Sequence, residues 1–286
     1  MRISSLRAVA LCSTAMALVL GSSMAFAAPP PVTSVRLYVM DCGKLKVDDP
    51  SRFNFKKEQL KTLDLSVGCY LIVHPKGVMI WDVGAVPDSH FKNDGKPATN
   101  FYATATKSLT SQMAAAGYTP ADVKYLVLSH YHWDHIANAN LFAKSTWMIE
   151  RIEHDTLFGP TPPERISPEQ YMPLAKSNTV YLPNRDYDVF GDGTVIVKPA
   201  YGHTPGHNVL FVKLAKTGPV ILSGDLYHYP EEVATGVVPH IDYNKDRTRE
   251  ARKMVADLMK KTGAQLWIQH DLVQFQGLKK APAYYE

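Results

Sequence analysis

The sequence lacks the features that mark several common protein classes. Three cysteines in 286 residues exclude a small disulfide-rich framework. Basic residues occur in runs of two at most and the formal net charge is only +4, so there is no clustered basic face of the kind that nucleic-acid binding needs. Phosphate-binding glycine loops, internal repeats and low-complexity tracts are also missing. The 45% of hydrophobic residues instead indicates a globular protein with a sizeable core.

The first 27 residues have the three parts of a secretory signal. Arg2 and Arg7 precede an apolar run over residues 8–20, and Ala25-Phe26-Ala27 forms an A-x-A cleavage site. This run is too short to span a bilayer, and no later segment reaches about 18 apolar residues. We therefore expect cleavage near Ala27, export to the periplasm or the medium, and no membrane span.

Export changes how the cysteines are interpreted. Cys12 lies inside the signal, which leaves Cys42 and Cys69, each beside a strand-like apolar run. An oxidising compartment permits them to form a disulfide. Two buried thiols that pack as small hydrophobic side chains are equally consistent with the sequence. The pairing therefore stays open at this point.

Short apolar runs alternate with helical stretches along the rest of the chain, which indicates an α/β layered fold. Residues 28–33 are expected to form an extended leader, and residues 34–286 a single domain. The predicted strands are 34–40, 68–74, 77–82, 124–128, 146–150, 194–198, 208–214, 220–223 and 265–269. The predicted helices are 103–116, 136–142, 168–175 and 246–261. Segments 86–101 and 157–193 are long connections, which are commonly lids or insertions near a site.

The densest group of metal-ligand side chains follows the predicted strand 124–128. It reads His130-Tyr131-His132-Trp133-Asp134-His135. Residues i and i+2 of an extended segment point to the same side, so His130 and His132 can converge on one ion. Asp134 and His135, at the turn into a helix, can face a second ion. Imidazole and carboxylate are ligands that suit zinc.

Four ligands do not complete a two-metal site, so further ligands should follow other strands. Three segments qualify: the Gly-His-Thr-Pro-Gly-His loop over 202–207, Ser-Gly-Asp over 223–225 and Gln-His-Asp over 269–271. Each adjoins a predicted strand.

Taken together, these motifs resemble the metallo-β-lactamase superfamily over about residues 34–275. Trp81-Asp82-Val83-Gly84 also matches that superfamily's early Asp-x-Gly turn. The resemblance implies an αββα sandwich and two divalent metal ions per chain, with zinc as the expected metal. It implies the following ligands: His130, His132 and His207 for the first metal, Asp134, His135 and His270 for the second, and Asp225 as the bridge. His203 and Asp82 are then expected to support the site, Asp82 by orienting a ligand imidazole.

Within the superfamily the resemblance is nearest to the N-acyl-homoserine lactonases, including exported ones. The segment 35–43, the Cys69-Tyr70-Leu71-Ile72 run and the compact length support it. The implied function is degradation of quorum-sensing signals, in which a hydroxide shared by two metals attacks the lactone carbonyl. Asp134 would then pass a proton to the leaving oxygen. The implied partner is an acylated lactone, and the oligomeric state, including a homodimer, is left open.

One departure from the lactonase pattern lies just after the bridging aspartate. Those enzymes commonly have a tyrosine three residues beyond it, whereas this chain has Tyr227 two residues beyond and His228 three residues beyond. Either side chain could contact the substrate carbonyl, and both are candidate catalytic residues. Candidate walls for an acyl chain are Trp133, Phe91, Phe101, Tyr102 and Phe158.

Proteins with other functions could use the same set of metal ligands. A carboxylesterase, a phosphotriesterase or a weak β-lactamase could use this site, because one fold hosts many chemistries. From a different class, a non-catalytic zinc-binding module could hold the same metals. Comparison of turnover across these substrate classes separates the alternatives.

Overall fold

The alternation of side chains along the first long strand explains the layered architecture. In β1 (Arg36–Leu45), Leu37 and Val39 belong to an apolar cluster shared with a second sheet, whereas Tyr38 and Met40 face a cluster shared with helices. Both faces of this strand are therefore covered. The computed structural model describes residues 32–92 and 94–286. The predicted signal and most of the predicted leader lie outside the described residues.

The larger sheet has eight strands in the order β4-β5-β1-β2-β3-β6-β7-β8. After β1, its strands along the chain are β2 (Leu65–His74), β3 (Gly77–Trp81), β4 (Ala98–Asn100), β5 (Ala103–Ala105), β6 (Val123–Val127), β7 (Thr146–Ile149) and β8 (Thr179–Tyr181). The pairs β3–β6, β6–β7 and β7–β8 are parallel. The carboxyl ends of β3 and β6 consequently lie at one edge of the sheet.

The smaller sheet has five strands in the order β13-β12-β11-β10-β9. Its strands are β9 (Tyr187–Asp188), β10 (Val195–Pro199), β11 (Asn208–Leu214), β12 (Gly218–Leu222) and β13 (Gln265–Trp267). Here β12 and β13 are parallel, so the segments that follow them leave the sheet at the same edge. A central cluster of buried side chains from both sheets joins the two layers.

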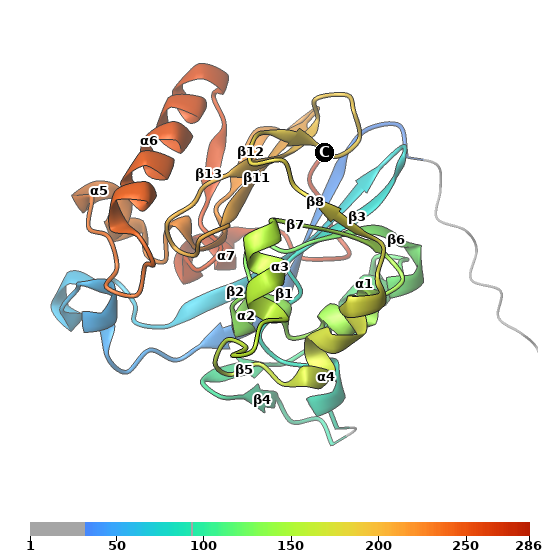
Figure 1. The fold of residues 1–286 in the computed structure, drawn as a ribbon, viewed down its shortest axis with the longest axis horizontal. Coiled ribbons are helices and arrows are strands. Elements are labelled where there is room, and N and C mark those ends of the chain that lie inside the picture. The colour runs from blue at the N-terminus through green and yellow to red at the C-terminus, as the bar shows by residue number, and fades with distance from the viewer. Residues whose placement is uncertain (1–31, 93) are drawn as a thin grey trace, which may run out of the picture. The chain divides into compact units, whose positions relative to one another are not determined.

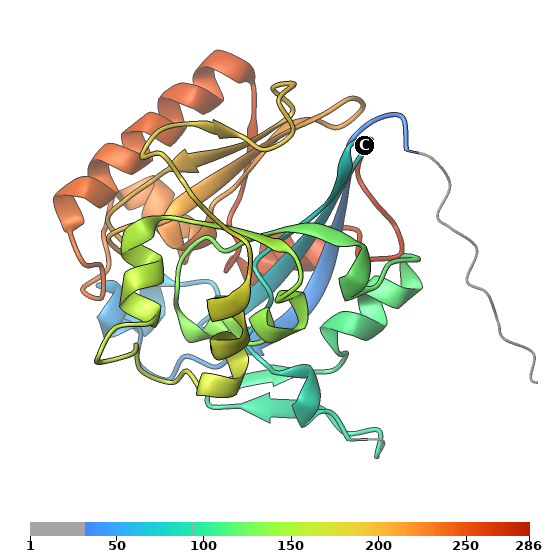
Figure 2. The same cartoon turned by 45° about the vertical axis from the view of Figure 1, so that its right-hand side comes forward.

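Helices cover the outer faces, which gives the predicted αββα sandwich (Figures 1 and 2). Against the larger sheet pack α1 (Leu109–Ala115), α2 (Trp133–Ile136), α3 (Arg151–Leu157) and α4 (Pro168–Tyr171). The long helix α6 (Lys245–Thr262) covers the smaller sheet through Ala251 and Val255. The remaining helices are α5 (Pro230–Thr235) and α7 (Leu272–Gly277). None of the described helices is long and apolar enough to cross a membrane.

The predicted helix over 103–116 is partly wrong. Residues 103–105 form β5, which pairs with the end of β1, and the helix begins only at Leu109. Ser108 caps that helix by accepting the backbone N–H of Ser111. The local apolar pattern did not reveal a strand pairing that depends on a partner about 60 residues earlier in the chain.

Cys42 and Cys69 form a disulfide, which resolves the question that the sequence left open. The bond links β1 to β2 beside Gly84, where a Cβ atom would come within 2.7 Å of the Cys42 Cβ. The Asp82–Gly84 turn is therefore packed directly against the disulfide.

Candidate metal centre

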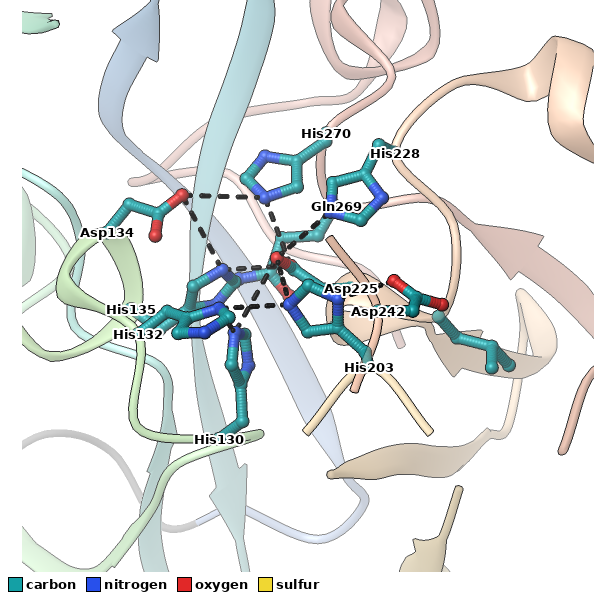
Figure 3. Close-up of polar contacts among 12 residues, drawn as sticks. His130, His132, Asp134, His135, His203, Asp225, His228, Asp242, Gln269 and His270 are labelled. Atoms are coloured by element: carbon teal, nitrogen blue, oxygen red, sulfur yellow. Dashed lines mark hydrogen bonds and ion pairs between the residues drawn. The ribbon is translucent and has the colours of Figure 1, made fainter. Parts of the chain in front are cut away.

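Four loops bring imidazoles and carboxylates together at one edge of the sandwich (Figure 3). His130 and His132 follow β6, and Asp134 and His135 lie in the first turn of α2. The other loops leave β10, β12 and β13 and supply His203, Asp225 and His270. Apart from the half-buried His132, these side chains are buried.

The side chains form two groups of four that share Asp225. One group is His130, His132, His203 and Asp225, and the other is Asp134, His135, His270 and Asp225; within each group the ligand atoms lie within 4.8 Å of one another. Asp225 Oδ2 is 3.2 Å from His203 Nε2, and Asp225 Oδ1 is 2.9 Å from His135 Nε2 and 3.0 Å from His270 Nε2. One carboxylate therefore offers an oxygen to each group.

This arrangement fits two metal ions. Ligand atoms about 2.0–2.1 Å from a tetrahedral zinc ion are about 3.3 Å apart from one another. In the first group, His132 Nδ1 lies 2.9 Å from both His130 Nε2 and His203 Nε2. In the second group, His135 Nε2 and Asp225 Oδ1 are buried without a hydrogen-bond partner among the described residues. A cation satisfies such converging, unpartnered ligand atoms.

The expected roles of His203 and His207 are reversed in the structure. His207 Nε2 accepts the backbone N–H of Asp225 at 2.9 Å, and its Nδ1 lies 3.0 Å from the Ala200 carbonyl oxygen. Burial lowers the pKa of His207 to about 3, so the ring is neutral and both nitrogens are engaged. His203 faces the first group instead, and the prediction of His207 as the ligand is wrong.

Contacts behind the ligands fix their ring orientations. Asp82 Oδ2 is 2.9 Å from His135 Nδ1, which places Asp82 at the position that the resemblance implied. The Ser66 carbonyl oxygen is 2.7 Å from His270 Nδ1. Asp242 Oδ1 is 3.0 Å from His203 Nδ1, a contact that sequence reasoning missed because no motif surrounds Asp242. Such partners set the tautomer of a ligand histidine.

Two glycines permit the close approach of the ligand loops. Gly224 has φ +50°, and a Cβ atom there would lie 2.6 Å from His207 Nε2. Gly202 has φ +140°, and a Cβ atom there would lie 2.3 Å from the Thr248 backbone nitrogen. Both positions exclude larger residues on steric grounds and by backbone conformation.

The bridging carboxylate is ionised. Burial alone would raise the pKa of Asp225, but the neighbouring His135, His270 and His130 hold it well below its usual range. The site thus presents a negative oxygen to each group of histidines.

His228 and Tyr227 have different environments. Tyr227 is buried in the cluster beneath α6, with the Arg252 guanidinium 4.4 Å from its ring centroid, so its placement as a substrate contact is wrong. His228 Nε2 lies 3.3 Å from Asp225 Oδ2, and the side chain lines the cavity. Although burial opposes the charged form, Asp225 and then Glu232 raise the pKa of His228 to about 10.

A cavity of about 700 Å³ opens over the two groups, a volume typical of small-molecule sites. Tyr102 and Trp133 line it, as does part of the long segment 157–193 through residues 163–165. The other candidate wall residues do not line it: Phe101 packs edge-on against Trp133, and Phe91 and Phe158 pack against the apolar cluster of the larger sheet.

Two four-ligand groups that share a carboxylate, at the edge of an αββα sandwich, define a dinuclear metal site. The sequence pattern of the metallo-beta-lactamase superfamily matches residues 63–259. The chain therefore belongs to the metallo-β-lactamase superfamily.

Proteins and solved structures that are similar to this chain include N-acyl homoserine lactonases. The N-acyl homoserine lactonase AttM of Azorhizobium caulinodans is 32% identical over 273 residues, which cover 89% of this chain and 100% of that protein. An N-acyl homoserine lactonase of a Bacillus species is 27% identical, over 88% of this chain and 100% of that protein. The solved structure of an N-acyl homoserine lactone hydrolase, with the product N-hexanoyl-L-homoserine at its catalytic metal centre, matches with a TM-score of 0.73. That match has 25% identity and covers 88% of this chain and 100% of the other.

Proposed function

We propose that the protein is a dinuclear-metal hydrolase that opens the lactone ring of N-acyl-homoserine lactones. The observation that carries the proposal is the pair of ligand groups joined by Asp225 at the floor of the cavity. The full-length similarity to N-acyl homoserine lactonases supports the choice of substrate.

Water is added across the ring ester in this reaction. Its oxygen bonds to the carbonyl carbon, the bond from that carbon to the ring oxygen breaks, and the products are a carboxylate, an alcohol and a released proton. Two divalent ions, when bound, supply a hydroxide nucleophile at neutral pH and polarise the carbonyl. The seven proposed ligands are His130, His132, His203, Asp134, His135, His270 and Asp225.

Side chains of the protein transfer the proton and stabilise the negative charge that develops on the carbonyl oxygen. Asp134 lines the cavity, with a carboxylate oxygen 3.7 Å from His270 Nε2. We assign it the transfer of a proton from the attacking water to the leaving ring oxygen. His228 presents Nε2 to the cavity on the other side of Asp225 and takes the place of the tyrosine expected three residues beyond the bridge. We assign it the contact with the substrate carbonyl oxygen, a role worth about 10²–10³ in rate when the geometry is good.

The cavity walls suit an acyl chain. Apolar surface in the lining comes from Trp133, Tyr102, Leu45 and Ile241. The Arg165 guanidinium lies 5.3 Å from the Tyr102 ring centroid at the same cavity. The lining also includes charged residues, among them Lys46, Arg52 and Glu164, so the cavity offers both apolar and polar surface to an amphipathic molecule.

Zinc is the metal that we propose, because the ligands are imidazole nitrogens and carboxylate oxygens. We also propose export, with removal of residues 1–27. The Cys42–Cys69 disulfide supports export, since such bonds persist mainly in oxidising compartments.

A comparison of turnover on several substrates tests the proposed function. The metal-replete protein is assayed on N-hexanoyl-homoserine lactone by proton release, beside a nitrophenyl ester, a phosphotriester and a carbapenem. We expect the lactone to have the highest kcat/KM. Good esterase turnover without lactone turnover would contradict the substrate assignment and leave the metal site standing.

A further inference from the structure

A buried ion pair lies directly behind His228. Glu232 is fully buried in the first turn of α5, and Arg252 of α6, which is 7% exposed, contacts its Oε2 through Nη2. Neither residue belongs to the metal ligands or to a recognised motif. Buried charged residues are uncommon and call for a specific explanation.

Arg252 holds the whole segment that carries His228. Its Nε donates to the Leu226 carbonyl oxygen at 2.9 Å, and its Nη1 donates to the Val237 carbonyl oxygen at 2.5 Å. The segment from Leu226 through α5 to Val237 is therefore tied to α6 at both ends. Glu232 lies between these two attachments.

Glu232 contacts His228 through both the backbone and the side chain. Its Oε1 accepts the backbone N–H groups of His228 and Tyr229 at 3.2 and 3.3 Å. The same oxygen faces His228 Nδ1 at 3.6 Å, beyond hydrogen-bond distance, and this nitrogen is buried without a hydrogen-bond partner among the described residues. The opposite ring nitrogen, Nε2, points toward Asp225. The two nitrogens of one imidazole thus face carboxylates on opposite sides.

Two aromatic rings also pack against the His228 ring. His270 stacks on it nearly parallel, with 5.5 Å between ring centroids, and Phe53 lies at a centroid distance of 4.8 Å. These apolar and aromatic contacts confine the plane of the ring, but they do not distinguish its two flipped orientations. A carboxylate facing Nδ1 does distinguish them.

We propose that Glu232 is a positioning residue that fixes the orientation of His228, with Nδ1 toward Glu232 and Nε2 toward the substrate. Arg252 in turn holds the Glu232 carboxylate in place. This inference rests on the proposed function, because it concerns how the carbonyl-contacting group of that reaction is oriented. It explains why the histidine at this position is accompanied by a buried acid four residues later.

The test is a double-mutant cycle of Glu232→Gln and His228→Ala, with kcat, KM and metal content measured for every variant. Glu231→Gln, one position away on the same helix, is the matched control for the change in charge. We expect Glu232→Gln to lower kcat about 10- to 100-fold with two metals retained and KM changed less than about threefold. In the His228→Ala background the same substitution should change kcat less than about twofold, because a positioning residue has no effect without the group it positions.

Two results would overturn the proposal. One is a Glu232→Gln protein with a kcat like that of Glu231→Gln, and the other is an equal loss of kcat with and without His228. If the unpaired Arg252 prevents folding of the single variant, Glu232→Gln is compared within an Arg252→Gln background. A smaller loss of kcat is expected there, because Arg252 no longer holds the Glu232 carboxylate, and no loss at all would count against the proposal. Every variant is assayed on the lactone and on a nitrophenyl ester. An absence of lactone turnover in the wild type contradicts the proposed function. In that case the ratio of each variant's kcat to the wild-type kcat on the nitrophenyl ester still tests the positioning role of Glu232.

Discussion

His207 Nε2 accepts the backbone N–H of Asp225, and the two atoms are 2.9 Å apart. The histidine therefore holds the main chain of the bridging residue while His203 faces its side chain. Both histidines come from one six-residue loop, yet they support the site in different ways. His203 offers a ring nitrogen to a metal, and His207 offers one to the protein backbone.

Substitution of these two histidines should separate the roles. His203→Ala removes a ligand of the first group, so we expect about one metal per chain after dialysis and a loss of at least 10²-fold in kcat. His207→Gln keeps a side-chain acceptor near the Asp225 N–H, so two metals and activity within about tenfold of the wild type are expected. Metal content by elemental analysis and initial rates provide the measurement. The reverse pattern, with metal lost only from the His207 variant, would restore His207 as the ligand.

The sequence predicts the buried strands and the metal-binding segments well, because both depend on local patterns. The predicted strand 208–214 matches β11 residue for residue, and the predicted helix 246–261 differs from α6 by one residue at each end. Hydrophobic periodicity is sufficient for such elements. The short strands β4, β8 and β9 have two or three residues each and were missed, since their existence depends on pairing with distant partners.

In the site, as in the fold, local patterns were predictable and tertiary contacts were not. The segments that supply ligands could be recognised, but the choice between His203 and His207 depends on which ring faces Asp225 across the fold. The sequence also could not show that Tyr227 packs beneath α6 while His228 turns toward the cavity. Asp242 and Glu232 have no motif around them and contact the site through tertiary structure alone.

The pH dependence of stability should report on Glu153. This residue is 1% exposed, and its carboxylate accepts the backbone N–H groups of Tyr131, which lies between two ligands, and of Gly206, in the loop that supplies His203. Burial raises the pKa of Glu153 from 4.5 to about 7. The folded protein therefore binds this proton more tightly than the unfolded chain does, so the free energy of unfolding falls as pH rises from 4.5 to 7.

A Glu153→Gln variant tests that linkage by urea denaturation at several pH values. The difference in unfolding free energy, wild type minus variant, should fall by about 3 kcal/mol across this interval. The exposed Glu169→Gln is the control and should run parallel to the wild type. Parallel curves for Glu153→Gln as well would show that its burial does not affect the pH dependence.

Removal of the Cys42–Cys69 disulfide should destabilise the fold without removing a ligand. The bond closes a segment with a sequence separation of 27 residues, for which the loop-entropy relation gives about 3–4 kcal/mol. We expect a Cys42→Ala/Cys69→Ala protein to lose about this much free energy of unfolding while it retains two metals. Denaturation of oxidised wild type and variant at equal metal concentration measures it. Equal stability of the two proteins would show that the disulfide does not stabilise the fold.

The most direct test of the central claim is a metal titration followed by lactone ring opening. The chelated protein is supplied with zinc in steps, and the initial rate on N-hexanoyl-homoserine lactone is recorded at each step. We predict negligible activity without metal and a rise that saturates at two equivalents per chain, with Asp225→Ala inactive throughout. Full activity in the chelated protein, or saturation at one equivalent, would contradict a lactonase that works through two metals bridged by Asp225.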